Sequence, residues 1–180
     1  GLDPDTVRDM SADIDDMDKI IGQFLDFARI TTGEEPIEGD LASLVLEAAH
    51  AYTRHDKPVL LGRVDPLPAL RFRPLAIRRC LNNLIDNALS FSPEGGIVSV
   101  SAHRARGRIV IAVEDQGPGI PAAERADALR RFHRLEGATE SGSGLGLSIV
   151  ARIAELHGAR LELAEGAGGK GLKVGLRFAD

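Results

Sequence analysis

One helical pattern constrains the fold of this chain more than any other stretch, because it has a defined start and a continuous apolar face. Pro74 can open the helix, since the missing N–H of proline costs nothing in the first helical turn. Apolar residues then recur at helical spacing and form one stripe: Ile77, Leu81, Leu84, Ile85 and Ala88. The stripe predicts a long helix that packs one face against a core.

Two asparagines lie on this helix at positions where leucine or glutamate would be better helix formers. Asn83 and Asn87 are four residues apart, so their amides lie on one face, roughly 120° from the centre of the apolar stripe. Taken alone, the pair has two interpretations. The amides are boundary groups that satisfy their own hydrogen bonds, as most buried amides do, or they face a ligand. Two glycine-containing motifs later in the chain favour the second interpretation.

Residues 5–30 are predicted to form a separate long helix. Its apolar residues alternate in steps of three and four, which is typical of a helix that pairs with another helix: Val7, Met10, Ile14, Met17, Ile21, Phe24 and Ala28. Residues 1–30 hold eight Asp against three Lys or Arg, a net charge of −5, and the rest of the chain is neutral. The acidic face is either a solvated surface or a docking surface for a basic partner. The neutral remainder argues against a nucleic-acid binder.

The rest of the chain combines helices with runs of strands. We expect a linker at 31–36 and strands at 36–39, 59–64, 69–72, 97–102, 109–113, 160–164 and 172–178. Further helices are expected at 41–54, from residue 121, and at 145–157, with the polar, Gly- and Ser-rich residues 129–143 as a mobile segment. The hairpin of residues 97–113 should have one buried face. Because the strands come in runs and not in βαβ units, the predicted fold class is α+β, a two-layer α/β sandwich preceded by a long N-terminal helix.

The composition suits a folded domain in a reducing compartment. Hydrophobic residues make up 43% of the chain and charged residues 27%, which is enough for a core and argues against disorder. Cys80 is the only cysteine, so no disulfide forms within the chain. We expect neither a membrane span nor a signal peptide, because no apolar run approaches roughly 20 residues. Since the sequence starts inside a helical pattern, we expect it to be a fragment.

A second motif, Asp-Gln-Gly-Pro-Gly-Ile at residues 115–120, follows a predicted strand directly. A carboxylate at a strand end, here Asp115, can accept a hydrogen bond from an exocyclic amine. Gly117 and Gly119 let the backbone approach a flat ring, because no β-carbon intervenes. The alternative interpretation is a tight turn with an acidic first residue.

A third motif, Gly-Ser-Gly-Leu-Gly-Leu at residues 142–147, opens a predicted helix. The free N–H groups and the positive end of a helix dipole suit a phosphate. The motif is not a P-loop, since no Lys-Ser/Thr follows, and not a dinucleotide fingerprint, since no strand precedes it. By itself it indicates only a glycine-rich turn.

In this order, on a helix, a strand end and a helix start, the three motifs resemble the ATP-binding domain of sensor histidine kinases, within the wider group that includes gyrase and MutL. The similar segments are the N box (83–88), the first glycine box (115–120), the phenylalanine box (131–134) and the second glycine box (142–147). The resemblance covers nearly the whole chain. Residues 1–32 look like the second helix of the dimerisation hairpin, and residues 33–180 look like the kinase catalytic domain, whose fold is of the Bergerat type.

The resemblance implies a site for ATP and Mg²⁺. Asn87 would be a Mg²⁺ ligand, with the metal otherwise held by phosphates and water. Asp115 would bind the adenine amino group, in a pocket shaped by three residues: Gly117, Gly119 and Ile120. The lid would close over the phosphates with five residues: Gly142, Gly144, Leu145, Gly146 and Leu147. Arg134 would offer a fork of donors to a phosphate, and Asn83 would contact the nucleotide, both as catalytic residues.

Asn83 also separates two classes of the wider group. In the resembling hydrolases, a glutamate four residues before the metal asparagine activates water, and an amide cannot act as such a base at neutral pH. The resemblance therefore implies a protein-histidine kinase, which transfers the γ-phosphoryl group of ATP to a histidine for relay to an aspartate of a response regulator. One alternative is an ATP-gated clamp or ATPase, against which Asn83 argues. Another is a non-catalytic docking module, against which the intact glycines and Asp115 argue.

Partners and location follow from the resemblance alone. Glu-Glu-Pro at residues 34–36 and the segment after it are similar to kinases of the EnvZ type, which pair with OmpR-like response regulators. The full-length parent would be a homodimer in the bacterial inner membrane, with this domain in the cytoplasm. For the domain itself we expect no nucleic-acid partner and no direct membrane contact.

Two departures from the family pattern have consequences. Ser90-Phe91 stands where the family often has Lys or Arg followed by Tyr, which implies weaker nucleotide affinity. The family's acceptor histidine is followed by an acid and a short Arg-Thr-Pro-like sequence, and no histidine of this chain has that context: His50, His55, His103, His133 and His157. We therefore expect the chain to bind ATP and to lack its own phosphoacceptor.

Overall fold

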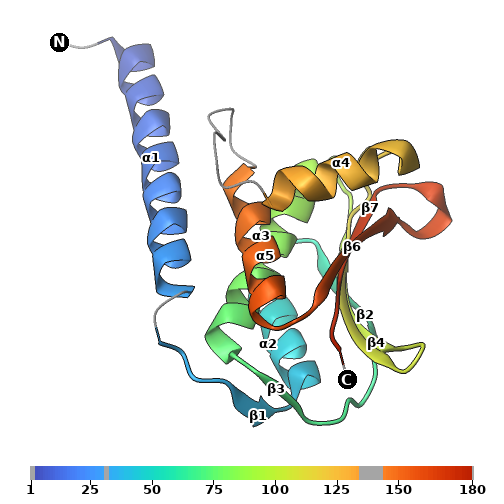
Figure 1. Ribbon diagram of the computed structural model, residues 1–180. Coiled ribbons are helices and arrows are strands. Elements are labelled where there is room, and N and C mark those ends of the chain that lie inside the picture. The colour runs from blue at the N-terminus through green and yellow to red at the C-terminus, as the bar shows by residue number, and fades with distance from the viewer. Residues whose placement is uncertain (1–2, 31–32, 134–143, 180) are drawn as a thin grey trace.

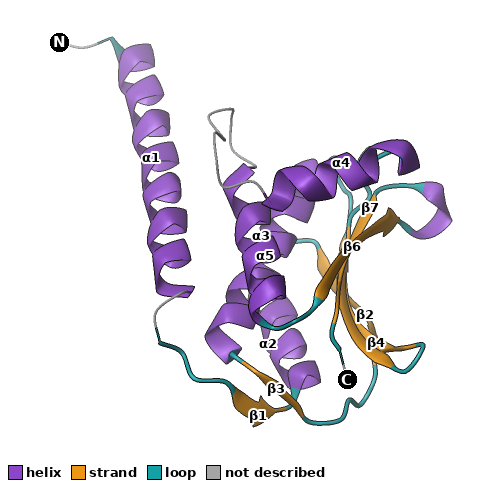
Figure 2. Cartoon of the chain, in the orientation of Figure 1, coloured by secondary structure: helices purple, strands orange, loops and turns teal. Residues whose placement is uncertain are grey.

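A computed structural model describes residues 3–30, 33–133 and 144–179 of the chain. Its main body is a five-stranded sheet with helices packed on one face, and a long N-terminal helix, α1, stands beside it (Figure 1). Figure 2 shows the same two layers, with the strands on one side and helices α2, α3 and α5 on the other. The predicted fold class, an α+β two-layer sandwich preceded by a long helix, is confirmed.

The first helix, α1 (Pro4–Ile30), agrees with the predicted N-terminal helix. The residues of the predicted apolar repeat whose side chains are described are each about half exposed: Val7, Met10, Ile14, Met17 and Ile21. Leu25, outside the predicted repeat, is 48% exposed. The side chains of Phe24 and Ala28, two further predicted seam positions, lie outside the described part of the chain. An exposed apolar seam of this length is what a helix presents to a partner helix. Neither α1 nor any other helix of the described residues is both long and apolar enough to cross a membrane.

A short linker joins α1 to the main body. After it, β1 (Ile37–Gly39) pairs antiparallel with β3 (Leu70–Phe72) as a separate two-stranded sheet. The helix α2 (Leu41–Thr53) begins after Asp40, whose side chain accepts a hydrogen bond from Ala42 N at 2.9 Å. Asp40 therefore caps α2, as the sequence predicts.

The main sheet has the strand order β2-β4-β5-β7-β6. Its strands are β2 (Val59–Val64), β4 (Val98–Ala105), β5 (Arg108–Glu114), β6 (Arg160–Glu165) and β7 (Leu172–Arg177). Neighbouring strands are antiparallel except β2 and β4, which are parallel, so the expectation of no βαβ unit is wrong at this pair. The connection from β2 to β4 contains β3 and α3 (Pro74–Phe91), which is enough chain to return to the same end of the sheet.

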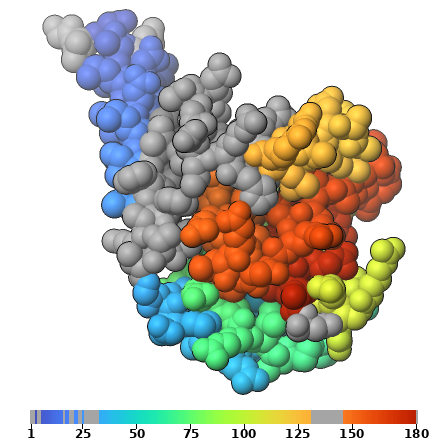
Figure 3. All heavy atoms as spheres, viewed as in Figure 1, coloured from blue at the N-terminus to red at the C-terminus, as the bar shows by residue number. Residues whose placement is uncertain are grey.

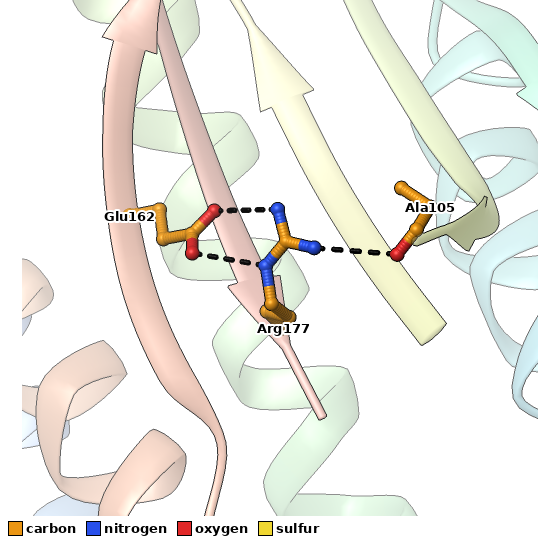
Figure 4. Close-up of polar contacts among 3 residues, drawn as sticks. All are labelled: Ala105, Glu162 and Arg177. Carbon is orange, nitrogen blue, oxygen red and sulfur yellow. Dashed lines mark hydrogen bonds and ion pairs between the residues drawn. The ribbon is translucent and has the colours of Figure 1, made fainter. Parts of the chain in front are cut away.

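The central strand, β5, is buried on both faces, whereas the sequence alternation predicts one buried face. Val110 and Ala112 point to the face without helices, yet they are only 7% and 2% exposed. The strand lies between β4 and β7, and the side chain of Arg177 on β7 reaches across it (Figure 4). Arg177 forms a two-pronged ion pair with Glu162 on β6, at 2.9 and 3.0 Å, and donates to the carbonyl oxygen of Ala105 on β4 at 3.3 Å. These neighbours cover the second face of β5.

The inner face of the sheet is covered mainly by α3 and α5 (Gly144–Leu156). The predicted apolar stripe of α3 is at most 4% exposed: Ile77, Leu81, Leu84, Ile85 and Ala88. The core also receives residues of α5: Ile149, Val150 and Ile153. Gly158, with φ +60°, ends α5 as predicted. The helix that carries the two asparagines is therefore fixed by its packing in the core.

The helix α4 (Ala122–His133) is longer than predicted. The predicted mobile segment starts at residue 129, but residues 129–133 are helical, so this part of the prediction is wrong. Ala128 is buried and Leu129 packs against the core, and these apolar contacts extend the helix. Residues 134–143 of the predicted mobile segment lie outside the described residues.

Candidate functional site

The two asparagines of α3 lie half-buried beside its apolar stripe. The Asn83 side chain donates from Nδ2 to the carbonyl oxygen of Arg79, one turn earlier, at 3.0 Å. This bond leaves the amide oxygen of Asn83 directed away from its own helix. The Asn87 side chain forms no hydrogen bond with any residue that the structure describes. A half-buried amide in this state is available to a ligand.

The amide oxygen of Asn83 faces the first turn of α5. A β-carbon at Gly146 would lie 3.2 Å from Asn83 Oδ1, which is tighter than an ordinary contact. The start of α5 therefore lies against the asparagine face of α3. Because the first N–H groups of a helix have no partner within the helix, this contact brings backbone donors close to the amide of Asn83.

The predicted lid is described only in part. Gly144 and Leu145 begin α5, and Leu147 lies in the core at 7% exposure. Arg134, the predicted phosphate donor, and Gly142 lie outside the described residues. The structure thus describes residues 144–147 of this motif.

Asp115 follows β5 directly, and its side chain is only 4% exposed. One carboxylate oxygen, Oδ1, accepts two backbone hydrogen bonds, from Gly117 N at 2.8 Å and from Leu172 N at 3.1 Å. The second oxygen, Oδ2, accepts none from the described residues and is not sealed from solvent. The carboxylate is therefore fixed through one oxygen and keeps the other as an acceptor for a ligand.

The glycines of the Asp115 motif are required by close backbone contacts. At Gly117, a β-carbon would overlap the carbonyl oxygen of Phe91, the last residue of α3. Gly119 has φ +72°, and a β-carbon there would lie 2.6 Å from the carbonyl oxygen of Gly171, just before β7. No side chain fits at such distances. The motif is thereby packed between the end of α3 and the connection from β6 to β7.

The connection from β6 to β7 supports Asp115, although its sequence pattern alone predicts only a turn. Gly171 has φ +75°, and a β-carbon there would overlap the carbonyl oxygen of Asp115. The same connection also contacts the residue before Asp115, because Glu114 Oε1 accepts a hydrogen bond from Ala167 N at 2.5 Å. The sequence does contain one sign of this contact: residues 166–171 include four glycines. A simple turn between two strands does not need so many.

Residues at the end of α3 and at the end of the Asp115 motif lie next to these contacts. Ser90 Oγ donates back to the carbonyl oxygen of Asn87 at 2.8 Å, and Phe91 is 47% exposed. Ile120 is half-buried and packs against the core, while its carbonyl oxygen accepts a hydrogen bond from Arg125 Nε at 3.0 Å. Ser90 and Phe91 therefore present an exposed ring and a hydroxyl that is already hydrogen-bonded within the helix. Neither side chain carries a charge.

Burial shifts the pKa values of two titratable side chains on or near α3. Burial raises the pKa of the Cys80 thiol, which is fully buried in the core and stays neutral. Burial, together with a hydrogen bond to Asp86, raises the pKa of Tyr52, whose hydroxyl donates to Asp86 Oδ1 at 2.8 Å. Neither is a candidate acid or base at neutral pH. Among the described residues, His, Cys, Asp and Glu side chains form no group of three that could hold a metal ion.

Comparison with known proteins decides the family. A family model described as histidine kinase-, DNA gyrase B-, and HSP90-like ATPase matches residues 73–179. The chain belongs to this ATPase family. The matched part of this histidine kinase-like domain starts one residue before α3 and contains all three motifs. The predicted family is confirmed.

The curated relatives of this histidine kinase-like domain are sensor proteins. The alginate biosynthesis sensor protein KinB of Pseudomonas aeruginosa is 33% identical over 166 residues, which are 87% of this chain and 27% of that protein. Sensor protein QseC of Escherichia coli (strain K12) is 34% identical over 156 residues, 83% of this chain and 34% of that protein. The chain therefore spans about a third, or less, of the length of these relatives.

A solved structure with a nucleotide analogue has the same fold. The crystal structure of full-length ShkA in complex with AMPPNP matches 99% of this chain and 39% of that chain, with a TM-score of 0.71 and 25% identity. The family match, the sensor-protein relatives and this structure together identify the chain as an ATP-binding domain of the sensor histidine kinase type.

The histidine kinase-like domain brings together the motifs that the sequence singles out. Asn83 of the asparagine motif contacts Gly146 of the second glycine motif, and Gly117 of the first glycine motif packs against Phe91 at the end of α3. Gly171, which no motif in the sequence singles out, packs directly against the backbone of Asp115. Both glycine motifs therefore pack against α3, the helix that carries the asparagine motif.

Proposed function

We propose that the chain is the ATP-binding catalytic domain of a sensor histidine kinase and that it binds Mg²⁺-ATP between α3, the Asp115 motif and the start of α5. The observation that carries this proposal is the state of Asp115. Its Oδ1 is fixed by two backbone N–H groups, and its Oδ2 has no donor among the described residues. The exocyclic amine of adenine supplies such a donor.

The pocket for the base would be formed largely by backbone. Gly117 and Gly119 carry no β-carbon, so a flat ring can lie against the chain there. Ile120 is half-buried and offers the ring an apolar contact. An acidic acceptor at Asp115 favours adenine over guanine, which presents a carbonyl oxygen in place of the amine.

The phosphates and the metal would lie between α3 and α5. The amide oxygen of Asn87 suits a hard cation such as Mg²⁺, because it is half-buried and has no partner among the described residues. When bound, Mg²⁺ neutralises charge on the phosphates. Asn83 would contact the nucleotide from the same helix face. Six residues of the lid segment would enclose the phosphates: Arg134, Gly142, Gly144, Leu145, Gly146 and Leu147.

The reaction we propose is in-line transfer of the γ-phosphoryl group of ATP to a histidine. A nitrogen of the imidazole ring forms the new bond to phosphorus, and the bond from the γ-phosphorus to the bridging oxygen breaks, so that ADP leaves. The residues of this chain would contribute positioning and donors to the phosphates, which are the main protein contributions to phosphoryl transfer. Asn83 is an amide and cannot activate water as a base, which favours transfer over hydrolysis.

The acceptor and the partners would belong to a larger assembly. We infer that residues 1–32 are the second helix of a dimerisation hairpin and that residues 33–180 are the catalytic domain. The exposed seam of α1 suits partner helices in a homodimer. The acceptor histidine would lie on a paired helix, since no histidine of this chain has the family's acceptor context. An OmpR-like response regulator would receive the phosphoryl group, and the domain would work on the cytoplasmic side of a bacterial inner-membrane protein.

Nucleotide titration tests the site. The chain should bind AMPPNP in the presence of Mg²⁺, and Asp115→Asn should weaken binding about tenfold to a hundredfold, because the amide presents N–H where the amine needs an acceptor. Asp56→Asn is a matched control, since Asp56 is exposed and has φ +54°, a conformation that Asn adopts readily. No binding by the wild type, or equal effects of the two variants, would overturn the proposal.

A separate experiment tests the transferase activity. The first hairpin helix, added in trans with its histidine, should acquire labelled phosphate from [γ-³²P]ATP only when this chain is present. The Asp115→Asn variant should lose the transfer, and the Asp56→Asn control should keep it. Steady release of inorganic phosphate without labelling of the hairpin would favour the ATPase alternative.

A further inference from the structure

The linker after α1 reaches the start of α3. Glu34 lies in this linker, and its carboxylate accepts two backbone hydrogen bonds from the first turn of α3, from Leu75 N to Oε1 at 2.7 Å and from Ala76 N to Oε2 at 3.0 Å. The N-cap residue of α3 itself, Arg73, makes no side-chain capping bond. The helix that carries the two asparagines is therefore capped by a residue 41 positions before Leu75.

The bond between Glu34 and α3 is reinforced in two ways. A carboxylate at a helix N-terminus interacts favourably with the positive end of the helix dipole, and here both of its oxygens accept hydrogen bonds. Arg73 adds a third contact, since its Nε donates to the carbonyl oxygen of Glu34 at 2.8 Å. The linker is thus attached to α3 through both the side chain and the main chain of Glu34.

The end of α5 joins the same contact through His157. Its Nε2 accepts a hydrogen bond from Arg73 N at 3.0 Å, while Nδ1 lies 2.7 Å from the carbonyl oxygen of Ile153. Because a carbonyl can only accept, Nδ1 carries the proton and the ring is neutral. Burial lowers the pKa of His157, which agrees with the neutral form. We name this meeting point of linker, α3 and α5 the linker joint: Glu34, Arg73 and His157.

The linker joint lies on one side of the molecule. In the space-filling view, the linker, the start of α3 and the later turns of α5 adjoin on the same face (Figure 3). Phe178 packs edge-on against His157, with 6.4 Å between the ring centroids, and ties the joint to the core. The joint is therefore part of the folded domain and includes a residue of the linker, Glu34.

The two helices that leave the linker joint meet again at the candidate site. Asn83 lies eight residues beyond Leu75 on α3, about 12 Å along the helix, and Gly146 lies eleven residues before His157 on α5, about 16 Å along it. At these positions Asn83 Oδ1 faces Gly146. Since both helices are short and continuous, a shift of α3 at the joint moves Asn83 and Asn87 relative to the start of α5.

We propose that Glu34 is a positioning residue of the nucleotide site. It couples the binding of the linker to α3 with the position of the two asparagines on that helix. With Glu34 in place, α3 and α5 are held together at the joint and the asparagine face is aligned with the start of α5. When the linker withdraws, α3 loses its cap, the alignment relaxes and the affinity for ATP falls. The inference rests on the proposed function, because it requires ATP to bind beside Asn83 and Asn87.

Two neighbouring glutamates provide a matched pair of variants. Glu34→Gln removes the charge of the cap, and Glu35→Gln makes the same change one residue later, where the side chain is exposed and forms no hydrogen bond or ion pair with the described residues. With Mg²⁺ present, we expect AMPPNP to bind Glu34→Gln about fivefold or more weakly than the wild type, the lower end of typical coupling between sites. Binding by Glu35→Gln should stay within about twofold of the wild type.

The outcomes separate this inference from the proposed function. If the wild type binds AMPPNP and Glu34→Gln binds it equally well, the coupling is absent and the proposed function stands. The same conclusion follows if both variants lose affinity to the same extent. If the wild type does not bind AMPPNP, the proposed function fails, and the inference fails with it.

Hydrogen exchange in the wild-type chain separates coupling from a mere loss of stability. Coupling is reciprocal, so bound nucleotide must strengthen the cap by the factor that the cap adds to nucleotide affinity. AMPPNP should therefore slow amide exchange at Leu75 and Ala76 about fivefold or more. Ala42 N, which Asp40 caps on α2, should exchange at an unchanged rate. Unchanged exchange at Leu75 and Ala76 under saturating nucleotide would show that Glu34 serves stability alone and would overturn the inference.

Discussion

The side-chain oxygen of Asn83 on α3 faces Gly146 in the first turn of α5, so closely that a β-carbon on residue 146 would lie 3.2 Å from it. Asn83 is also bonded to the carbonyl oxygen of Arg79 at 3.0 Å, which limits how far its side chain can move. The asparagine motif and the second glycine motif meet at this contact. The distance between the two helices at the site therefore depends on the absence of a side chain at residue 146.

Gly146→Ala should weaken nucleotide binding without a matching loss of stability. Alanine is favoured over glycine within a helix by about 1 kcal/mol, which offsets the tight contact with Asn83, so the free energy of unfolding should change by less than about 1 kcal/mol. Affinity for AMPPNP should fall at least about tenfold, because the contact displaces Asn83 or the start of α5. Calorimetric titration and thermal unfolding measure the two effects.

Gly22→Ala in α1 is the control for this prediction. A β-carbon at Gly22 meets no atom within 4 Å, so the change adds helix propensity without a contact. Its affinity for AMPPNP should equal that of the wild type. Equal affinities of Gly146→Ala and the wild type would show that the contact with Asn83 does not matter to the site.

Gly171→Ala should destabilise the fold far more than Gly168→Ala. The two glycines lie in the same connection and have φ values of +75° and +70°, so both substitutions carry the strain of a left-handed alanine, about 1–2 kcal/mol. At Gly168 the added β-carbon meets nothing within 4 Å, whereas at Gly171 it overlaps the carbonyl oxygen of Asp115. We expect a loss of about 3 kcal/mol or more at Gly171. Urea unfolding of the two variants measures the difference, and equal losses would contradict the support of Asp115 by this connection.

The elements of this fold are predictable where their signals are local. The spacing of the apolar stripe from Ile77 to Ala88 is enough to predict α3. Asp40 predicts the start of α2, because carboxylates are preferred at helix N-caps. The three motifs are equally local, since each is a short run of residues at a helix or a strand end. That both glycine motifs pack against α3 was expected only through the family resemblance, because periodicity carries no information about distant contacts.

The features that were missed depend on contacts between distant segments. The parallel pairing of β2 with β4 follows from how the chain crosses over the sheet, and no residue pattern within either strand reveals it. The support of Asp115 by Gly171 joins residues 56 positions apart, and the cap of α3 by Glu34 crosses 41 positions. The high density of glycines near Gly171 was the only local sign of the contact with Asp115. Nothing in the linker sequence indicated that Glu34 caps α3.

Asn87→Ala should remove the metal dependence of nucleotide binding and leave the fold intact. The Asn87 side chain has no hydrogen-bond partner among the described residues, so its loss removes no contact that holds α3. Without the amide oxygen, the site loses its proposed ligand for Mg²⁺, and addition of Mg²⁺ should no longer increase the affinity for AMPPNP. Asn82→Ala, on an exposed face of the same helix, should retain the full Mg²⁺ effect. An unaltered Mg²⁺ effect in Asn87→Ala would remove Asn87 from the proposed metal site.

His157 should make the stability of the chain depend on pH. Its pKa in the folded chain is lowered from the ordinary value of 6.5, chiefly by burial. Above that pH the ring is neutral in both the folded and the unfolded chain, and its full contribution to stability is present. Below it, the unfolded chain takes up a proton that the folded chain resists, so the free energy of unfolding falls as the pH falls towards the folded pKa. Urea unfolding at a series of pH values from about 5 to about 8 measures this loss.

His157→Gln should reduce that loss on acidification. Glutamine does not titrate in this range, and its side-chain oxygen can still accept the hydrogen bond from Arg73 N that His157 accepts at 3.0 Å. The wild type should therefore lose more stability than the variant as the pH falls below 6.5, while both keep a constant difference above it. His55→Gln, at an exposed position after α2, controls for the chemical change and should follow the wild type. Parallel curves for the wild type and His157→Gln would mean that protonation of this ring is not resisted by the fold, and that the neutral His157 is not needed at the linker joint.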